Sequence, residues 1–153
     1  MSGKVFQINI SNGGVPKTGL PRAEFTQNGL TGDAQRALHV HGGPDRAVCL
    51  YSLEVIQALQ SEGHPIFPGA AGENVTVSGL VWEVLMPGAR LRLGPEVVIE
   101  ITKYTTPCDN LVPYFSDGNF NRINQKTHPG WSRLYARVLV PGEVKVGDAV
   151  RVE

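Results

Sequence analysis

Cys108 is the residue whose type and position best suit it for chemistry. It lies in the stretch 105–110, Thr-Thr-Pro-Cys-Asp-Asn, directly after the apolar run 97–103. Strand ends often present reactive groups, and Thr106 could cap a short helical turn that has Pro107 at its first position. The unpaired N–H groups of such a turn would stabilise a thiolate on Cys108. The alternative is a buried cysteine that packs as a small apolar side chain.

The second cysteine, Cys49, has a different setting. Its neighbours Ala47, Val48 and Leu50 are apolar, which favours a packed and unreactive thiol. In a reducing compartment, two cysteines are expected to remain separate thiols rather than to form a disulfide. We therefore predict that Cys49 belongs to the core and that Cys108 carries the chemistry.

A zinc site is a weaker hypothesis. His39 and His41 are two residues apart on a predicted strand, so their rings would share one face. Cys108 or Asp45 could complete a zinc site with them. The sequence lacks the paired-cysteine and HExxH spacings that are typical of zinc proteins, which favours ordinary surface histidines.

A glycine-rich cluster at 42–46, Gly-Gly-Pro-Asp-Arg, could bind an anion. Glycine lets backbone N–H groups approach a ligand closely, and the Arg46 guanidinium offers a fork for phosphate oxygens. Lys17 and Arg133 could add positive charge. The spacing supports equally well a tight turn stabilised by a local Asp45–Arg46 pair. Neither a P-loop nor a GxGxxG motif is present.

The composition indicates the kind of scaffold that must position these residues. The chain has 153 residues, of which 18 are glycine and 11 are proline, and 41% of its residues are hydrophobic. Valine outnumbers leucine, and β-branched side chains fit a pleated sheet. These features exclude disorder, a coiled coil and collagen, and they predict a single, mostly β domain over residues 1–153.

Short apolar runs separated by glycine or proline predict many strands. The predicted strands are 6–10, 23–25, 38–41, 47–51, 74–77, 89–93, 97–103, 136–140, 143–146 and 149–152. The segments 90–94 and 143–148 look like two versions of one hairpin, which suggests a closed barrel without exposed edges. One helix is predicted over Leu53–Glu62, because Ser52 is a good N-cap and Gly63 is a stop signal. Short helical turns complete the prediction.

The segment 116–131 is long for a connection inside a compact domain. It is rich in Asn, Gly, Ser and Lys. A lid or binding loop and a disordered excursion that contacts nothing are equally compatible with this composition.

Charge and hydropathy exclude several classes of partner. Lys+Arg and Asp+Glu both number 14, so the formal net charge is zero and no basic surface is expected to hold nucleic acid. No window approaches the roughly 20 apolar residues of a membrane span, and the first residues have no long apolar core. We therefore expect a cytoplasmic protein.

Taken together, these segments resemble the MOSC domain, the module named after the C-terminal part of molybdenum cofactor sulfurases. The strongest block is 41–52, His-Gly-Gly-Pro-Asp-Arg-Ala-Val-Cys-Leu-Tyr-Ser. Further matching pieces occur in order at 16–17, 29–33, 68–69, 72–77, 107–108, 133–139 and 147–148. Their order and spacing point to the small stand-alone bacterial members of the family, the YiiM-like type.

The resemblance implies a largely β, barrel-like fold with a single functional cysteine, which is Cys108 here. In the family that cysteine is thought to carry sulfane sulfur or to bind the molybdenum of a pterin cofactor, and both roles need an accessible thiolate. Cys108 is then the expected molybdenum ligand. The residues assigned to cofactor binding are Lys17, Thr18, His41, Gly42, Gly43, Arg46, Asn74 and Arg133.

The resemblance also implies partners. Some relatives are fused to a pyridoxal-phosphate-dependent desulfurase, but no lysine here has a recognisable Schiff-base context. Pyridoxal phosphate would therefore belong to a partner, such as a cysteine desulfurase, while a molybdoenzyme could be the other partner. Other relatives reduce N-hydroxylated compounds with electrons from separate proteins. An iron–sulfur cluster is not expected, because four thiolates would be needed and two cysteines are present.

Three functions therefore remain open at this point. The first is a molybdenum-cofactor-binding or sulfur-carrier protein that uses Cys108, and it is motivated by the ordered motif match. The second is a molybdenum-dependent reductase of N-hydroxylated compounds with a separate electron donor. The third is a non-catalytic β-barrel interaction module that keeps the fold and has an unreactive Cys108.

Overall fold

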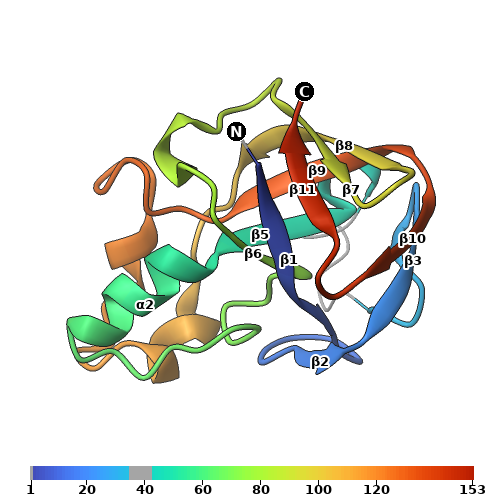
Figure 1. The fold of residues 1–153 in the computed structure, drawn as a ribbon. Coiled ribbons are helices and arrows are strands. Elements are labelled where there is room, and N and C mark those ends of the chain that lie inside the picture. The colour runs from blue at the N-terminus through green and yellow to red at the C-terminus, as the bar shows by residue number, and fades with distance from the viewer. Residues whose placement is uncertain (1, 35–42) are drawn as a thin grey trace.

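A computed structural model describes residues 2–34 and 43–153 (Figure 1). Its strands are β1 (Ser2–Ile10), β2 (Thr18–Leu20), β3 (Arg22–Thr26), β4 (Gly29–Leu30), β5 (Val48–Ser52), β6 (Val75–Ser78), β7 (Arg90–Leu93), β8 (Val97–Tyr104), β9 (Leu134–Val140), β10 (Gly142–Lys145) and β11 (Ala149–Val152). The main helix is α2 (Leu53–Ser61), and the 3-10 turns are η1 (Pro44–Arg46), η2 (Trp82–Val84), η3 (Asp109–Tyr114) and η4 (Phe120–Ile123). The mostly β fold is confirmed, while the strand predicted at 38–41 lies outside the described residues.

Seven of these strands form a closed barrel. Their order is β11-β7-β8-β9-β5-β6-β1, and pairing between β1 and β11 closes the ring. Neighbouring strands are antiparallel except β5 and β6, which run parallel. In Figure 1 the blue β1 and the red β11 lie side by side, with both termini at the same end. Closure removes the unpaired edges that an open sheet would expose.

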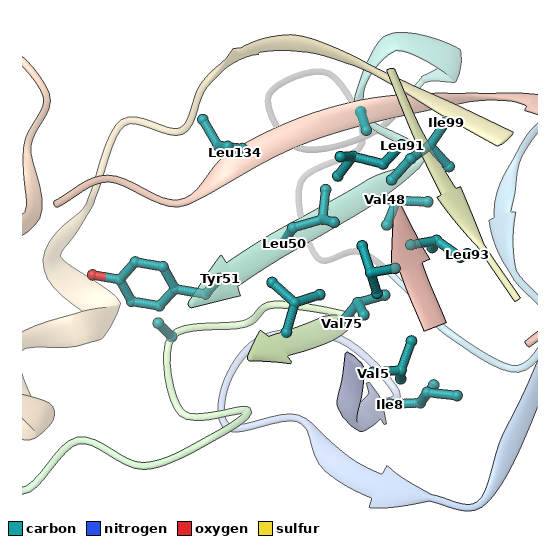
Figure 2. Close-up of a cluster of buried hydrophobic side chains, with 14 of the residues drawn as sticks. Val5, Ile8, Val48, Leu50, Tyr51, Val75, Leu91, Leu93, Ile99 and Leu134 are labelled. Atoms are coloured by element: carbon teal, nitrogen blue, oxygen red, sulfur yellow. The ribbon is translucent and has the colours of Figure 1, made fainter. Parts of the chain in front are cut away.

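The barrel interior is filled by aliphatic side chains from several strands. Figure 2 shows Val48 and Leu50 of β5, Leu91 of β7 and Ile99 of β8 in one cluster of buried side chains, and none of the four is measurably exposed. In β7 the buried Leu91 follows the exposed Arg90, because successive side chains of a strand point to opposite faces. The short apolar runs of the sequence thus supply the core of the barrel.

The helix α2 follows β5 directly and packs against β5 and β6. The Ser52 hydroxyl caps it by accepting a hydrogen bond from a backbone N–H of the first turn. Ile56 and Leu59 are fully buried on its inner face. The helix predicted over Leu53–Glu62 is therefore confirmed, with Glu62 as its C-cap. Within the described part of the chain, no helix has the length and hydrophobicity to cross a bilayer.

The two segments that look like one hairpin in the sequence pair differently. β7 forms a hairpin with β8, whereas β10 pairs with β3 in a separate sheet of order β10-β3-β4. After β10, Lys145 N–H donates a hydrogen bond to the Asp148 carboxylate at 2.9 Å, and β11 then pairs with β7 and β1. The chain changes sheets at this turn, so the expectation of a second equivalent hairpin is wrong.

The segment 116–131 is packed against the rest of the molecule. Ile123 is fully buried, and Arg122 donates two hydrogen bonds to the carboxylate of Glu62 at 2.9 and 2.7 Å. The Arg122 guanidinium also stacks on the ring of Trp131, 3.8 Å from its centroid. These contacts contradict the disordered alternative, and the segment covers the end of α2.

The barrel core predicts a clear stability difference between two apolar truncations. Leu50→Ala should lower the free energy of unfolding by about 2–5 kcal/mol, because a fully buried side chain leaves a cavity behind. Val146→Ala should change it by less than about 0.5 kcal/mol, because Val146 is 45% exposed. Urea denaturation followed by circular dichroism measures both. Equal losses for the two variants would contradict the described core.

Candidate functional site

One cavity collects several of the residues that the sequence singles out. It has about 570 Å³ of free space, counting the solvent in its open mouth. Its lining includes Lys17, Asn74, Cys108 and Arg133, which come from four segments far apart in the sequence. We refer to it as the Cys108 cavity.

Cys108 lies on the cavity wall with its side chain partly exposed. Its thiol donates a hydrogen bond to Asn110 Oδ1 at 2.7 Å, so the Asn110 amide fixes the direction of the sulfur. The η3 turn begins two residues later than predicted, because Leu111 N–H donates to the Cys108 carbonyl and Cys108 itself is the N-cap. The prediction that Thr106 caps this turn is therefore wrong.

Arg133 places a buried positive charge beside the same cavity. It immediately precedes β9, and only 7% of it is exposed. Its Nη1 donates to the Ala71 carbonyl at 2.7 Å, whereas its buried Nε has no hydrogen-bond partner among the described residues. Within those residues no carboxylate forms an ion pair with it. The Arg133 guanidinium therefore keeps one N–H donor without an acceptor among the described residues.

The backbone keeps Arg133 close to the segment that leads to Cys108. Thr105 N–H donates a hydrogen bond to the Arg133 carbonyl at 3.0 Å. The hydroxyl of the buried Ser132 donates to the Thr105 carbonyl at 3.2 Å. The guanidinium and the thiol are thus held by two strand ends that are hydrogen-bonded to each other.

Lys17 also lines the cavity, but its charge is paired. Its Nζ donates to both carboxylate oxygens of Asp33, at 2.6 and 2.7 Å, and both side chains are buried. Asp33 also accepts hydrogen bonds from Asn74 Nδ2 at 2.9 Å and from Ser11 N–H at 3.0 Å. The expected role of Lys17 as an additional free cation therefore does not fit this geometry. Instead, Lys17 and Asp33 tie together the loops that form one wall.

Asn74 connects this wall to the barrel. Its side-chain oxygen accepts a hydrogen bond from the backbone N–H of Cys49 at 3.0 Å, while its Nδ2 donates to Asp33. Asn74 is 1% exposed, so these bonds are shielded from water. These hydrogen bonds hold the Asn74 side chain in a fixed position in the cavity wall.

A buried acid, Glu73, lies next to the cavity lining. Its Oε2 accepts hydrogen bonds from Gly69 N–H at 3.0 Å and from the Thr76 hydroxyl at 2.9 Å. Its Oε1 has no partner among the described residues. Burial raises the pKa of the Glu73 carboxyl above its ordinary value, despite the opposing effects of its hydrogen bonds and of Arg133. Among the described residues, no ion pair joins the Glu73 carboxyl to Arg133.

Cys49 lines the cavity as well, although the sequence assigns it to the core. Only 6% of it is exposed, and burial raises the pKa of its thiol to about 11. Its Sγ lies 4.0 Å from the Thr105 hydroxyl. Cys49 is therefore a neutral thiol at physiological pH, which agrees with the prediction of a packed side chain.

Three other predicted binding residues do not line the cavity. Thr18 is exposed on β2, where its hydroxyl donates to the Ile10 carbonyl at 3.4 Å. Gly43 is the N-cap of η1, with φ of +92° that suits glycine. The Arg46 guanidinium lies 5.8 Å from the centroid of the Tyr135 ring, and it is Tyr135 that lines the cavity. Arg46 is thus separated from the site by an aromatic ring.

His39, His41 and Gly42 lie outside the described residues. In the described ranges, no three His, Cys, Asp or Glu side chains are grouped to hold a metal ion. Asp45 lies 3.8 Å from Arg137, across an exposed surface.

Sequence reasoning missed Asp33, Glu73, Asn110 and Tyr135. Asn110 had a local signal, because it follows Cys108 by two residues and has an amide that suits a thiol. Asp33 and Glu73 had none, because only the folded chain shows which acids are buried and which cation faces them.

Comparison with known proteins identifies relatives of this chain. The family model described as the MOSC domain matches residues 37–151. The uncharacterized protein YflK of Bacillus subtilis is 36% identical over 117 residues, covering 76% of this chain and 52% of YflK. Protein YiiM of Escherichia coli is 34% identical over 125 residues, covering 78% of this chain and 54% of YiiM. The chain thus spans about half the length of these two relatives.

Solved structures show the same fold. The crystal structure of YiiM from Geobacillus stearothermophilus aligns with a TM-score of 0.78 at 22% identity, over 99% of this chain and 75% of that one. YiiM from Escherichia coli aligns with a TM-score of 0.72 at 25% identity, over 100% of this chain and 70% of that one. The expected small, MOSC-like barrel is therefore confirmed.

The Lys17–Asp33 pair should be essential to the cavity wall. Asp33→Asn should lower the free energy of unfolding by about 3–5 kcal/mol, because it leaves the buried Lys17 ammonium without a carboxylate. The double variant Lys17→Met, Asp33→Asn should recover part of this loss. Urea denaturation measures each variant. Glu143→Gln is the control, because it breaks an exposed pair with Lys145 and should cost less than about 1 kcal/mol.

The buried acid should give the protein a characteristic pH dependence. Because the native pKa of Glu73 is raised above 4.5, the native state retains a proton that the unfolded state releases as the pH rises above this value. The Glu73 contribution to stability therefore falls with rising pH, by at most about 1.4 kcal/mol per pH unit.

Glu73→Gln mimics the neutral acid and should remove that loss. The difference in unfolding free energy between Glu73→Gln and wild type should then grow from pH 5 to pH 7.5 in urea titrations. A difference that is independent of pH would show that Glu73 is not the titrating group.

Proposed function

The chain belongs to the MOSC domain family, and we propose that it binds a molybdenum cofactor or carries sulfane sulfur on Cys108. The observation that supports this most is the pairing, in one cavity, of a partly exposed thiol with the uncompensated guanidinium of Arg133. A soft sulfur binds molybdenum or another sulfur atom, and the cation attracts an anionic ligand. No other residue combination of the described chain offers both properties together.

The side chains present fit the requirements of such a cofactor. Cys108 supplies a sulfur ligand, which suits a soft metal centre. Arg133 Nε has an unused donor for an anionic group, and Asn74 and Asn110 add amides to the wall. When bound, a molybdenum cofactor supplies two-electron chemistry at its metal. The chain's own contribution is to orient Cys108 through Asn110 and to hold the anionic part of the ligand at Arg133.

The sulfur-carrier role uses the same groups. A persulfide on Cys108 would remain in the cavity mouth, where the Asn110 amide can orient either sulfur atom. Cys49 would not compete for the sulfur, because its thiol is buried and has a raised pKa. The chain thus offers one reactive position rather than two.

Partners would supply or consume what the cavity holds. We propose a cysteine desulfurase as sulfur donor, a molybdoenzyme as acceptor, or a reductase as electron donor. The relatives are about twice as long as the part that matches here, so their further domains could perform such roles. Both cysteines are free thiols, which suits a cytoplasmic location.

A molybdenum-dependent reductase of N-hydroxylated compounds is the second candidate. It is supported by a relative from Gibberella moniliformis named "Reductase", which is 29% identical over 127 residues. The match covers only 22% of that protein. For this activity we propose a separate protein as electron donor. The third possibility is an interaction module without a ligand. A negative result in the experiment below would favour it.

The proposal predicts that cofactor loading depends on Cys108. The protein should be purified from cells with an intact molybdenum-cofactor pathway, and its molybdenum and releasable pterin measured. Cys108→Ser should hold about tenfold less molybdenum than wild type, because it loses the soft ligand. Cys49→Ser is the matched control and should load normally, since its buried thiol is not a ligand.

Two results would argue against the proposal. Equal molybdenum in wild type and Cys108→Ser would remove Cys108 from the site. A Cys108 that holds no molybdenum, accepts no sulfur from a desulfurase, and reacts with iodoacetamide no faster than a model thiol would favour the interaction module.

A further inference from the structure

The unpaired Nε of Arg133 points to a specific chemical feature of the ligand. A buried N–H without an acceptor costs about 1–3 kcal/mol, and more when the donor is charged. Only 7% of Arg133 is exposed, and its Nε has no acceptor among the described residues. A ligand oxygen in the cavity would remove this penalty. The guanidinium therefore favours an oxyanion.

The other charges around the cavity do not supply a competing partner. Lys17 and Asp33 neutralise each other through two hydrogen bonds. Oε2 of the buried Glu73 carboxyl accepts hydrogen bonds from Gly69 N–H and from the Thr76 hydroxyl, and no ion pair joins it to Arg133 among the described residues. In the part of the chain that the structure describes, Arg133 is thus the cation of the cavity lining whose charge has no ion-pair partner.

The thiol on the same wall adds a second requirement. Cys108 reacts as a nucleophile with an electrophilic sulfur atom. A molecule that carries both a sulfane sulfur and an adjacent oxyanion would occupy both groups at once. Thiosulfonate anions have this structure, and thiosulfate is the simplest of them.

We propose that Cys108 takes sulfane sulfur from small thiosulfonate anions, with thiosulfate as the simplest substrate and Arg133 as the residue that holds their sulfonate group. The proposal rests on the sulfur-carrier role suggested above and names a substrate class for it. It also explains why the cation and the thiol share one cavity, since neither group alone would select such a molecule.

The transfer balances without an oxidant or a reductant. The proton that Cys108 donates to Asn110 in the structure first leaves to water. The thiolate then attacks the outer sulfur of thiosulfate and forms a new sulfur–sulfur bond. The original sulfur–sulfur bond breaks, and its electron pair leaves with sulfite. One persulfide anion and one sulfite dianion replace one thiolate and one thiosulfate dianion.

Arg133 has a defined role in this step. Negative charge accumulates on the sulfonate oxygens as the bond breaks, and a nearby guanidinium in a low-dielectric cavity stabilises that charge. Arg133 is held beside Cys108 by the hydrogen bond between its carbonyl and Thr105, three residues before the cysteine. It is therefore a substrate-binding residue rather than part of the barrel's packing alone.

The test is to incubate the purified protein with thiosulfate and to measure two products. Intact-mass spectrometry should show the gain of one sulfur atom on Cys108, and an equal amount of sulfite should be released. Cys108→Ser should give neither product, while Cys49→Ser should behave as wild type. Arg133→Gln should slow the transfer about 10–100-fold, because it removes a charge-assisted contact. Arg133→Lys, which retains the charge, should recover part of the rate.

Two alkylating agents separate anion binding from thiol reactivity. Iodoacetate carries a carboxylate and iodoacetamide is neutral, and both react with the same sulfur. Arg133→Gln should lower the ratio of the iodoacetate rate to the iodoacetamide rate, whereas a purely structural role for Arg133 would leave the ratio unchanged. The ratio is measured in each variant after circular dichroism has shown native secondary structure.

The outcomes distinguish this inference from the proposed function. Sulfur uptake from a cysteine desulfurase but not from thiosulfate would overturn the inference and leave the carrier role intact. Protection of Cys108 by inorganic phosphate, without any transfer from thiosulfate, would also overturn it and indicate a phosphate-bearing ligand. A Cys108 that accepts sulfur from neither donor would remove the carrier role on which the inference depends.

Discussion

The proposed chemistry of this protein depends on a positive charge that the fold removes from water and that no carboxylate of the described residues pairs with. Burying a guanidinium costs several kcal/mol, and the hydrogen bond from Arg133 to the Ala71 carbonyl offsets only part of this cost. The remainder must come from the barrel, whose β9 begins at the next residue and pairs with β8 and β5. A rigid, closed sheet can hold a group in an unfavourable environment because its own core is stable independently of that group.

The two other charged elements near the cavity are arranged so that Arg133 keeps its charge. Asp33 is fully engaged with Lys17, Asn74 and Ser11, so it is not available to the guanidinium. Glu73 is near enough to interact with Arg133, but its Oε2 is engaged by Gly69 N–H and the Thr76 hydroxyl, and burial raises the pKa of its carboxyl. If either acid paired with Arg133, the cavity would lose its attraction for anions. The hydrogen bonds that engage Asp33 and Glu73 are thus as important to the proposed site as Arg133 itself.

The sequence contains most of the fold and part of the site. Glycine and proline mark the ends of the strands, and Ser52 marks the start of α2, because these signals act locally. Cys108 was found for the same reason, since it directly follows a recognisable strand. The pairing partner of each strand cannot be predicted from such local signals. β10 pairs with β3 rather than with β11, because strand pairing depends on the whole sheet. The compensation of Lys17 by Asp33 likewise arises from a contact across 16 residues of the chain.

Burial explains why two cysteines in one cavity have different roles. Cys49 lies within β5, has little exposure and retains its proton because desolvation raises its thiol pKa to about 11. Cys108 lies beyond the end of β8, is partly exposed and donates a hydrogen bond to the Asn110 amide oxygen. The barrel thus fixes one sulfur in its wall and presents the other at its mouth. Because Arg133 is hydrogen-bonded to the segment that precedes Cys108, the exposed sulfur is also the one whose ligands we propose to be selected by charge.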